Sequence, residues 1–304
     1  ANTGTSPISI SGVSDSGTPL HGINFAAALT SDDVTITDSQ LQGTVAAISF
    51  EADLATTSIK ITGVTATSAA DAILFTGAVS GGSINIAHLK ATATNNALLF
   101  SGAVSAAAAI RVEHSALASS AAATNALQFA GAFSGSFAAA HSTFASTGGG
   151  DAIHAAADVS GTFSLALVTA TSSGAHAVRL FSLTSAAVEV VGGELAGGAA
   201  GVHVNSAVDA ASSVSVRGAA VVGTANGFEV AGAFAGKLSV SDGSVAATTG
   251  AALDFAAAVA STGAVSLLKA AVSSSGGSGV RFAADLGGKL RIQKCTTAGH
   301  GGSG

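Results

Sequence analysis

An apolar motif returns about every 25 residues along this chain and leaves almost no sequence outside it. Its first half is an apolar pair, found as Ile23-x-Phe25, Ile48-x-Phe50, Ile73-x-Phe75, Leu98-x-Phe100, Leu127-x-Phe129, Leu253-x-Phe255 and Val280-x-Phe282. About eleven residues later comes a second pair, found as Val34-x-Ile36, Ile59-x-Ile61, Ile84-x-Ile86, Ile110-x-Val112, Leu238-x-Val240 and Leu290-x-Ile292. A repeat this short cannot bury its own apolar face, so each copy must pack on the next.

The pairs alternate apolar and polar residues, which is the pattern of a strand with one buried face. A third inward segment follows each second pair, and in it a large residue is mostly matched by a small one. The matched positions are Ser39 with Leu41, Val64 with Ala66, Leu89 with Ala91, Ser115 with Leu117, Ser142 with Phe144, Gly193 with Leu195, Ala219 with Val221 and Gly243 with Val245. A narrow core packed to constant volume explains this compensation, whereas a helical repeat does not.

Turn residues separate the three segments. Glycine follows the first segment, and an Asx residue recurs before the next repeat, where we expect its side chain to bond the local backbone. The Asx positions are Asp71, Asn96, Asn125, Asp151 and Asn226. The alternative is an array of Ala-rich helices, nucleated at 106–109 and 121–123, but glycine and β-branched residues recur too often for useful helices.

We therefore predict an all-β fold, a single parallel β-helix of about eleven coils, each of about 25 residues with three short strands. Right-handed winding follows from the usual handedness of parallel crossovers. The solenoid is expected to run continuously over 1–295, with 1–20 a partial first coil, and 296–304 to be a Gly/Ser-rich tail or linker. Both ends break off within a coil and expose strand edges, which invite another copy to stack.

Composition narrows the function. Only 9% of the residues are charged, the 11 Lys and Arg are scattered without a basic stripe, and nucleic-acid binding is therefore not expected. No apolar run approaches the ~18 residues of a membrane span. The single Cys295 excludes a disulfide framework and, at a small inward position, is expected to be an inert buried thiol. The chain also lacks an initiator Met and a signal peptide, so we expect a mature or excised piece.

Stacked coils align equivalent residues into columns about 4.8 Å apart. The outward column of the first strand ends in titratable or basic residues: His154, Arg179, His203, Glu229, Asp254 and Arg281. Glu229 and Asp254 on adjacent coils suit the carboxylate pair of a retaining glycosidase, with His203 and Arg281 orienting sugar or steadying developing charge. The simpler interpretation is an exposed column in which His203 and Arg281 neutralise two acids, and no Trp or Tyr is present to stack a sugar ring.

Two further patterns have a functional and a plain interpretation. His88, His114 and His141 fall on successive coils, where they could share a metal ion or simply form a row of solvated corner residues, which we favour. Thr35-x-Thr37, Thr65-x-Thr67 and Thr92-x-Thr94 resemble the rows of ice-binding solenoids. They fall at different places in the repeat, so we do not expect them to share one flat face.

The coil pattern resembles the parallel β-helix repeat proteins, which include pectin-lyase-like enzymes, autotransporter passengers, phage tail spikes and repetitive surface adhesins. The Ala, Gly, Ser, Thr and Val bias is most similar to the surface or filament-forming members. The resemblance implies an extracellular or cell-surface structural or adhesive solenoid without a cofactor and without enzymatic activity. Its expected partner is a further copy of itself, stacked end to end, with glycans as an open second class. The alternatives are a polysaccharide-binding or polysaccharide-cleaving enzyme using Glu229 and Asp254, and an ice-binding protein.

Overall fold

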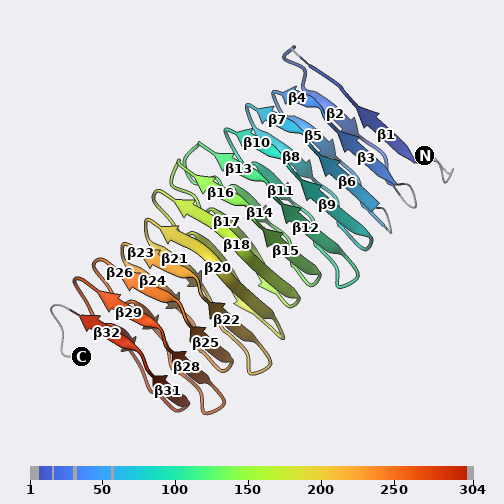
Figure 1. The fold of residues 1–304 in the computed structure, drawn as a ribbon. Helices are drawn as coiled ribbons and strands as arrows, with labels where there is room; N and C mark the ends of the chain where they lie inside the picture. Colours follow the sequence, from blue (N-terminus) through green and yellow to red (C-terminus); the bar gives the residue numbers. More distant parts are fainter. Residues whose placement is uncertain (1–6, 16, 30–32, 56–57, 300–304) are drawn as a thin grey trace.

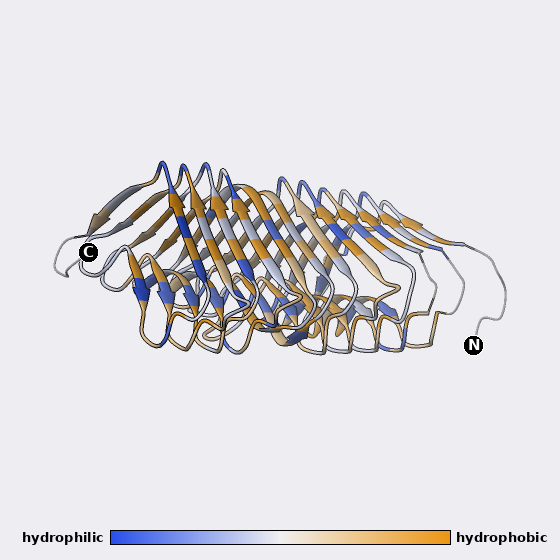
Figure 2. Cartoon of the chain, turned by 90° about the horizontal axis from the view of Figure 1, so that it is seen from below, coloured by the Kyte–Doolittle hydropathy of each residue, from blue (hydrophilic) through white to orange (hydrophobic). Residues whose placement is uncertain are grey.

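The computed structural model describes residues 7–15, 17–29, 33–55 and 58–299. Across these ranges it is an all-β solenoid of parallel strands stacked into about eleven coils, which confirms the predicted fold class. Figure 1 shows the coils following one another along a rod, and Figure 2 shows the two termini at opposite ends of it. No helix in the described part of the chain is long and apolar enough to cross a membrane.

The first strand of each coil belongs to an 11-stranded sheet, called the first-strand sheet. Its members are β2 (His21–Phe25), β5 (Ala46–Phe50), β8 (Asp71–Phe75), β11 (Leu98–Phe100), β14 (Leu127–Phe129), β17 (Ile153–Val159), β19 (Val178–Leu183), β21 (Ala200–Val204), β24 (Asn226–Val230), β27 (Leu253–Phe255) and β30 (Val280–Phe282).

The other strands form a 21-stranded sheet bent into two rows. The second-strand row holds β1 (Ile8–Ser11), β3 (Val34–Thr37), β6 (Ser58–Thr62), β9 (Ser83–Ala87), β12 (Ala109–Glu113), β15 (Ser136–Ala140), β22 (Ser213–Arg217), β25 (Lys237–Ser241), β28 (Ala264–Leu268) and β31 (Lys289–Gln293). The third-strand row holds β4 (Gln40–Gly43), β7 (Thr65–Ser68), β10 (Lys90–Ala93), β13 (Ala116–Ser119), β16 (Thr143–Ser146), β23 (Ala220–Gly223), β26 (Ser244–Ala247), β29 (Ala271–Ser274) and β32 (Thr296–Gly299). The long strands β18 (Thr162–Ser172) and β20 (Ala187–Gly197) run through both rows.

A fourth inward column, which the sequence analysis did not identify, lies between the first and second strands. It consists of isolated single-residue bridges at Leu29, Leu54, Val79, Val104, Phe133, Val159, Leu183, Val208, Phe234, Val259 and Leu286. The turn that leads into it is tight: a Cβ added at Gly102 would lie 2.4 Å from the carbonyl oxygen of Gly77 on the preceding coil. Glycine is therefore needed here because adjacent backbones touch, and not because of an unusual φ.

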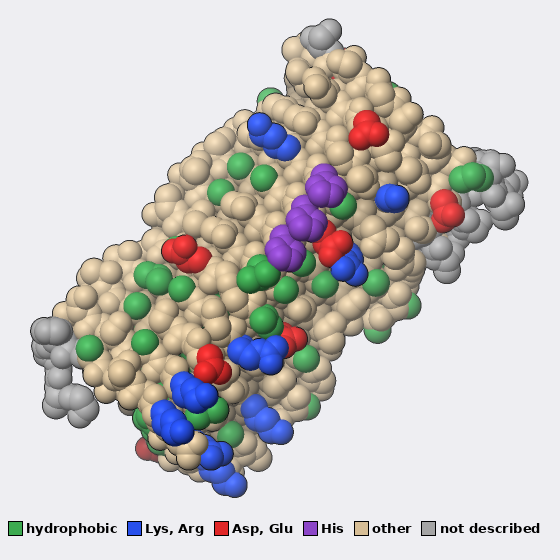
Figure 3. Space-filling view, viewed as in Figure 1, with side chains coloured by type: hydrophobic (Ala, Val, Ile, Leu, Met, Phe, Trp, Pro, Cys, Tyr) green, Lys and Arg blue, Asp and Glu red, His purple; other side chains and the backbone are tan. Residues whose placement is uncertain are grey.

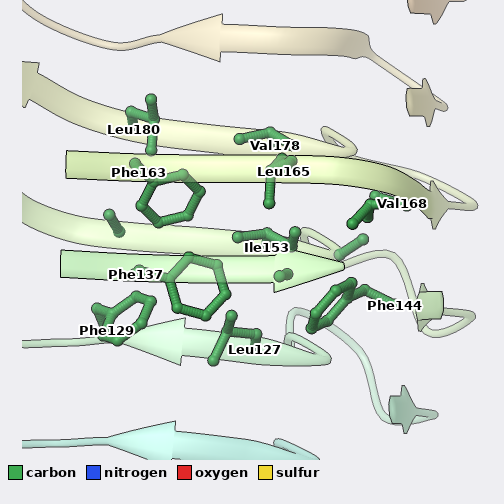
Figure 4. Packing of buried hydrophobic residues seen from close by; sticks show 14 of the residues in the cluster. Leu127, Phe129, Phe137, Phe144, Ile153, Phe163, Leu165, Val168, Val178 and Leu180 are labelled. Carbon is green, nitrogen blue, oxygen red and sulfur yellow. The ribbon is translucent and has the colours of Figure 1, made fainter. Parts of the chain in front are cut away.

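Phenylalanines form a stacked column inside the first-strand sheet. Phe25, Phe50, Phe75 and Phe100 lie ring on ring with centroids 4.6–4.7 Å apart. The column stops at Ala155, and there the core is filled from the other strands. In Figure 4, Phe137 and Phe163 of the second-strand row and Phe144 of the third-strand row fill the core around Phe129.

The compensation between large and small residues in the third-strand row is confirmed. Ser39 and Leu41 are both buried, as are Val64 and Ala66 on the next coil, so the same two inward sites hold different volumes. Where serine takes the first site it also bonds the backbone: Ser142 accepts a hydrogen bond from the backbone N–H of Ser115. The hydroxyl of this small polar residue thus has a hydrogen-bond partner inside an otherwise apolar core.

The corner between the second and third strands is held by one residue per coil with positive φ. This corner column comprises Gly12, Asp38, Gly63, His88, His114, His141, Leu167, Gly192, Gly218, Asp242, Lys269 and Lys294. The left-handed region favours Gly, tolerates Asn and Asp and is costly for branched residues. The three histidines and the charged residues around them therefore share one backbone position, which explains why they stack.

The Asx residues bond differently from what we expected. Their side-chain oxygens accept the backbone N–H of the equivalent residue on the next coil, as Asp71 does from Asn96 at 2.9 Å and Asn96 does from Asn125 at 3.0 Å. The expectation of a local turn was wrong because the side chain points along the rod axis, where the neighbouring coil offers an unpaired donor. The column therefore joins coils to one another, and its members are largely buried.

At the C-terminal end the structure places β32 over Thr296–Gly299, within the stretch expected to be a tail, while 300–304 lie outside the described residues. Cys295 has the expected inward position, equivalent to Ala270 on the coil before, but it is only partly buried. The reason is that no further coil covers it among the described residues. The expectation of a fully buried thiol was therefore wrong.

Candidate functional site

The outward column of the first-strand sheet has the register that we predicted. Each member pairs with the next across adjacent strands, through Asn24, Ser49, Leu74, Leu99, Gln128, His154, Arg179, His203, Glu229, Asp254 and Arg281. The second half of this column, from His154 to Arg281, is called the polar row. In a chain with 9% charged residues it is an unusual concentration of ionisable side chains.

A network of ion-pair contacts and one hydrogen bond links the first members of the polar row. His154 Nδ1 lies 3.5 Å from Oδ2 of Asp151, and the same carboxylate oxygen is 3.9 Å from Nη1 of Arg179. Arg179 donates one hydrogen bond, from Nη2 to Oδ1 of Asn205 at 3.4 Å. Its side chain is 36% exposed, and among the described residues one of its five N–H donors has a hydrogen-bond acceptor. Arg179 is the member of the row with the most unused hydrogen-bonding capacity.

Glu229 is held ionised by its neighbours. Its Oε2 lies 3.3 Å from Nδ1 of His203 and accepts a hydrogen bond from Nδ2 of Asn226 at 3.0 Å. The contact with the His203 imidazole is the main cause that lowers the pKa of the Glu229 carboxyl to about 2; burial opposes it and the Asn226 amide adds to it. The His203–Glu229 contact has the distance of an ion pair without hydrogen-bond geometry, so Nδ1 of His203 stays without a hydrogen-bond partner.

Asp254 is buried although it faces outward, with 1% of its side chain exposed. Arg281 covers it and donates two hydrogen bonds, from Nε to Oδ1 at 2.7 Å and from Nη2 to Oδ2 at 2.6 Å. This bidentate contact raises the pKa of the Arg281 guanidinium, first through the hydrogen bond and then through the charge of Asp254. A buried carboxylate paired in this way is fully satisfied within the protein.

The contacts of these two carboxyls differ from those that a retaining glycosidase requires. A retaining glycosidase needs one carboxylic acid that stays protonated and can reach the leaving-group oxygen. Glu229 has a lowered pKa, and both oxygens of Asp254 are occupied by Arg281. The register brings the four candidate residues together as predicted, and their catalytic role stays a prediction.

A shallow hollow of about 340 Å³ lies beside the polar row. Asn226, Thr249, Gly250, Gly277 and Arg281 contribute to its lining. Small side chains, including those of Ala225 and Ala251, border the hollow together with the polar groups of Asn226 and Arg281. No aromatic side chain lines it, which matches the lack of a sugar-stacking platform noted in the sequence.

The histidine column lies on the opposite part of the surface, at the corner column. The rings of His88 and His114 stack with centroids 5.3 Å apart, and those of His114 and His141 stack 5.0 Å apart (Figure 3). In parallel stacked rings the nitrogens point side by side and do not converge on one point. Within the described ranges, no group of three or more His, Cys, Asp or Glu is arranged to hold a metal ion.

The threonine pairs do not form one continuous face. Thr67 lies opposite Thr92 in the third-strand row, so Thr92-x-Thr94 is displaced by two residues from Thr65-x-Thr67. Thr35 belongs to the second-strand row. The expected lack of alignment is therefore confirmed for these pairs, and ice binding stays a prediction without a matching surface pattern.

The last coil presents core residues to solvent. Leu290 and Ile292 on β31 occupy the inward positions of Val265 and Leu267 on the coil before. Their exposed fractions are 39% and 47%, against 1% and 0% for those equivalents. Among the described strands β31 pairs only with β28, so its outer edge is an exposed apolar strand edge.

Several residues of the polar network were not singled out from the sequence. His176 stacks on His203 with ring centroids 4.4 Å apart, and it occupies the position that Asp151 holds on the preceding coil. Burial is the main cause that lowers the pKa of His176 to about 4, and the charge of His203 adds to this effect. The signal available was the repeat position itself, because His176 continues the Asx column. A comparison with protein-family models, curated proteins and solved structures finds no match to this chain.

Proposed function

We propose that the protein is an extracellular or cell-surface structural β-solenoid whose copies associate end to end into a filament or surface array. The observation that carries this proposal is the exposure of Leu290 and Ile292 at inward positions of β31. The lowered pKa of Glu229 and the occupation of both Asp254 oxygens by Arg281 support a structural role over an enzymatic one.

Both driving forces of the fold would act across such a junction. Open strand edges carry rows of free N–H and C=O groups that pair readily with another strand. A second coil laid on β31 would also bury apolar surface, which stabilises by about 25 cal/mol per Å². Because the ends differ, the contact does not close on itself, and repetition gives a fibre.

The test uses the 304-residue chain and one substitution on the exposed edge. Wild-type protein is expected to form rods several molecules long in negative-stain images and to sediment as a concentration-dependent series. Ile292→Lys places a charge at the inward site and should return the protein to monomers. Gln293→Lys adds the same charge to the next, outward residue of β31 and should assemble like the wild type.

A wild-type chain that stays monomeric at high concentration contradicts the proposal. Equal loss of assembly in Ile292→Lys and Gln293→Lys would also contradict it, because the effect would then follow net charge and not the apolar edge. Circular dichroism of both variants separates failure to assemble from failure to fold.

Glycan binding at the polar row is a second candidate, favoured by the free donors of Arg179 and by the hollow beside Arg281. It accounts for an adhesive role without bond cleavage. A glycan-binding screen with wild type and Arg179→Ala tests it, and Arg217→Ala, on the exposed second-strand row, is the control. If Glu229→Gln and Asp254→Asn abolished a polysaccharide-cleaving activity, the enzymatic alternative would replace it.

A further inference from the structure

Charge is distributed unevenly along the rod. The first lysine or arginine of the chain is Lys60, whereas the acids before it include Asp15, Asp33, Asp38, Glu51 and Asp53. At the other end, Lys269, Arg281, Lys289, Arg291 and Lys294 face one acid, Asp285, after residue 268. We expected the basic residues to be scattered, but Figure 3 shows the Lys and Arg side chains gathered near the C-terminal end. The rod therefore has an acidic end and a basic end.

Several charges at the two ends have no ion-pair partner among the described residues. Lys289, Arg291 and Lys294 are exposed, and none has an ion-pair partner in the described part of the chain. Asp33 is exposed as well, and the described residues offer no ion-pair partner to it or to Asp38. Unpaired charge of opposite sign at opposite ends favours association between different molecules.

The apolar columns of the two ends also match. In the second-strand row Ile8 lies opposite Val34 and Ile10 opposite Ile36, the same columns in which Leu290 and Ile292 end the rod. A second copy placed on β31 in the register of the rod would set Ile8 on Leu290 and Ile10 on Ile292.

In the first-strand sheet the described strands of the two copies would not meet at this junction. Phe282 stacks on Phe255 with centroids 5.0 Å apart, and Phe25 begins the stacked column at the other end. With β1 of the second copy on β31, β2 lies two coils from β30, so Phe25 would lie about 10 Å from Phe282. The described chain starts in the second-strand row, before β2, so both rows of the 21-stranded sheet continue across the junction, while one strand position of the first-strand sheet stays open between β30 of one copy and β2 of the next.

The same placement aligns charges along the corner column. Lys294 ends this column, and Gly12 and Asp38 begin it. Gly12 has no side chain, so the Lys294 side chain of one copy can pass over it towards Asp38 of the next, two coils or about 10 Å away. Lys289 and Asp33 are related in the same way at the start of the second strand, because each directly precedes the first inward residue of its strand. Lysine side chains are long and flexible enough for this reach.

We propose that copies of this chain associate head to tail, with β1 of one copy pairing in register with β31 of the next, and that the acidic and basic ends select this polarity. The inference rests on the proposed end-to-end association and adds its direction, its register and its electrostatic basis. Head-to-head and tail-to-tail contacts would set like charges against each other and would break the parallel ladder.

The first experiment reverses the charges of one end and then of both. Lys289→Glu with Lys294→Glu should lower the association constant at least about tenfold at low salt, and high salt should reduce the difference from the wild type. Adding Asp33→Lys with Asp38→Lys in the same chain exchanges the two ends and should restore association. Lys60→Glu with Lys90→Glu, the same charge change on β6 and β10 inside the rod and away from the terminal coils, is the matched control and should leave association unchanged.

The second experiment uses the single cysteine as a reporter of polarity. Cys295 and Val13 occupy the same column of the third-strand row, one at each end. Val13→Cys should therefore form disulfide-linked chains of many copies under mild oxidation, because stacked strands bring the Cα atoms within the range of a disulfide. Ser9→Cys, exposed on β1 and outside this column, should link far less.

The outcomes separate the two proposals. Filaments that ignore charge reversal and do not link through Val13→Cys would overturn the head-to-tail inference and leave end-to-end association standing. Wild-type dimers linked through Cys295 alone would show a tail-to-tail contact and would also overturn it. A wild-type chain that never assembles would overturn the proposed function itself.

Discussion

Single residues in this solenoid act mainly through their neighbours on adjacent coils. Asp151 shows this well: one oxygen accepts the backbone N–H of His176, and the other faces His154 and Arg179. Its side chain is 5% exposed, so a single carboxylate connects two coils in a largely dry setting. Removing such a group would leave buried donors without partners, which costs more than the net value of the bonds it makes.

Histidine 176 makes the stability of the protein depend on pH. Burial, with the charge of His203, lowers the pKa of His176 to about 4 from its ordinary 6.5. As the pH falls, the imidazole of His176 therefore takes up its proton at a higher pH in the unfolded chain than in the folded protein. The stability that neutral His176 contributes is complete above pH 6.5 and is lost between about pH 6.5 and 4. Glu229, whose pKa is lowered to about 2 from 4.5, acts in the same direction at still lower pH.

Between pH 6.5 and 4 the wild-type protein should lose more unfolding free energy than His176→Gln does. We predict a difference on the order of 1–2 kcal/mol, after allowing for solvent screening of a partly exposed group. Urea denaturation at a series of pH values measures this. The difference between variant and wild type at pH 8, where the imidazole is neutral in both states, gives the effect of the substitution on packing. An unchanged slope would show that His176 is not titrating in this range.

At the scale of one element, the corner column decides which residues each coil can carry. Ten non-glycine residues of the described chain have positive φ, and most of them lie at this corner. Leu167, within β18, differs from the glycines and the polar residues at the other corner positions. It is a branched apolar residue with a φ of 52° and an exposed fraction of 53%. It therefore bears the cost of the left-handed region without the gain of burial.

Leu167→Asn is expected to stabilise the protein by about 1 kcal/mol, because asparagine adopts this conformation more easily and little apolar contact is lost. A rise in the midpoint of urea denaturation would measure the gain. The matched control is Leu268→Asn, which replaces another half-exposed leucine at a regular strand position of β28 and should destabilise. A lower stability of Leu167→Asn would mean that its contact over Gly192 outweighs the strain.

The whole molecule behaves as a stack in which each coil is stabilised by the coils on both sides. An inner coil, such as the one formed by β14, β15 and β16, has a neighbouring coil on both sides. By contrast, β31 is exposed at all five of its residues. Local stability should therefore decrease towards the end of the described chain. The least stable coil is therefore the one whose open edge the proposed association would cover.

Hydrogen exchange should reveal this gradient. We predict that amides of β30, β31 and β32 exchange at least about tenfold faster than those of β14, β15 and β16 in dilute protein. Raising the protein concentration should slow exchange at β31 and β1 and leave the central strands unchanged, since a second copy would pair with both edges. Uniform exchange along the rod would contradict both the gradient and the stacking.

Much of the fold could be predicted from the sequence because the repeat is regular. The inward pairs such as Ile73-x-Phe75 fixed the strand faces, and equal spacing fixed which residues lie opposite one another, including Glu229 and Asp254. The bridge column at Val79 was missed, since one inward residue between two turns leaves no alternating pattern. The direction of the Asx side chains was mistaken because a local turn and a bond to the next coil require the same residue type.

The sequence alone determined the architecture: apolar residues at a fixed period can be buried only by stacking, and stacking sets every column. The tertiary structure decided which members of a column are accessible and which are paired. Asp254 and Arg179 occupy the same column, yet one is sealed beneath a guanidinium and the other is open to solvent. That difference depends on the side chains one coil above and below, whose conformations follow from packing and electrostatics in three dimensions and not from the period of the repeat.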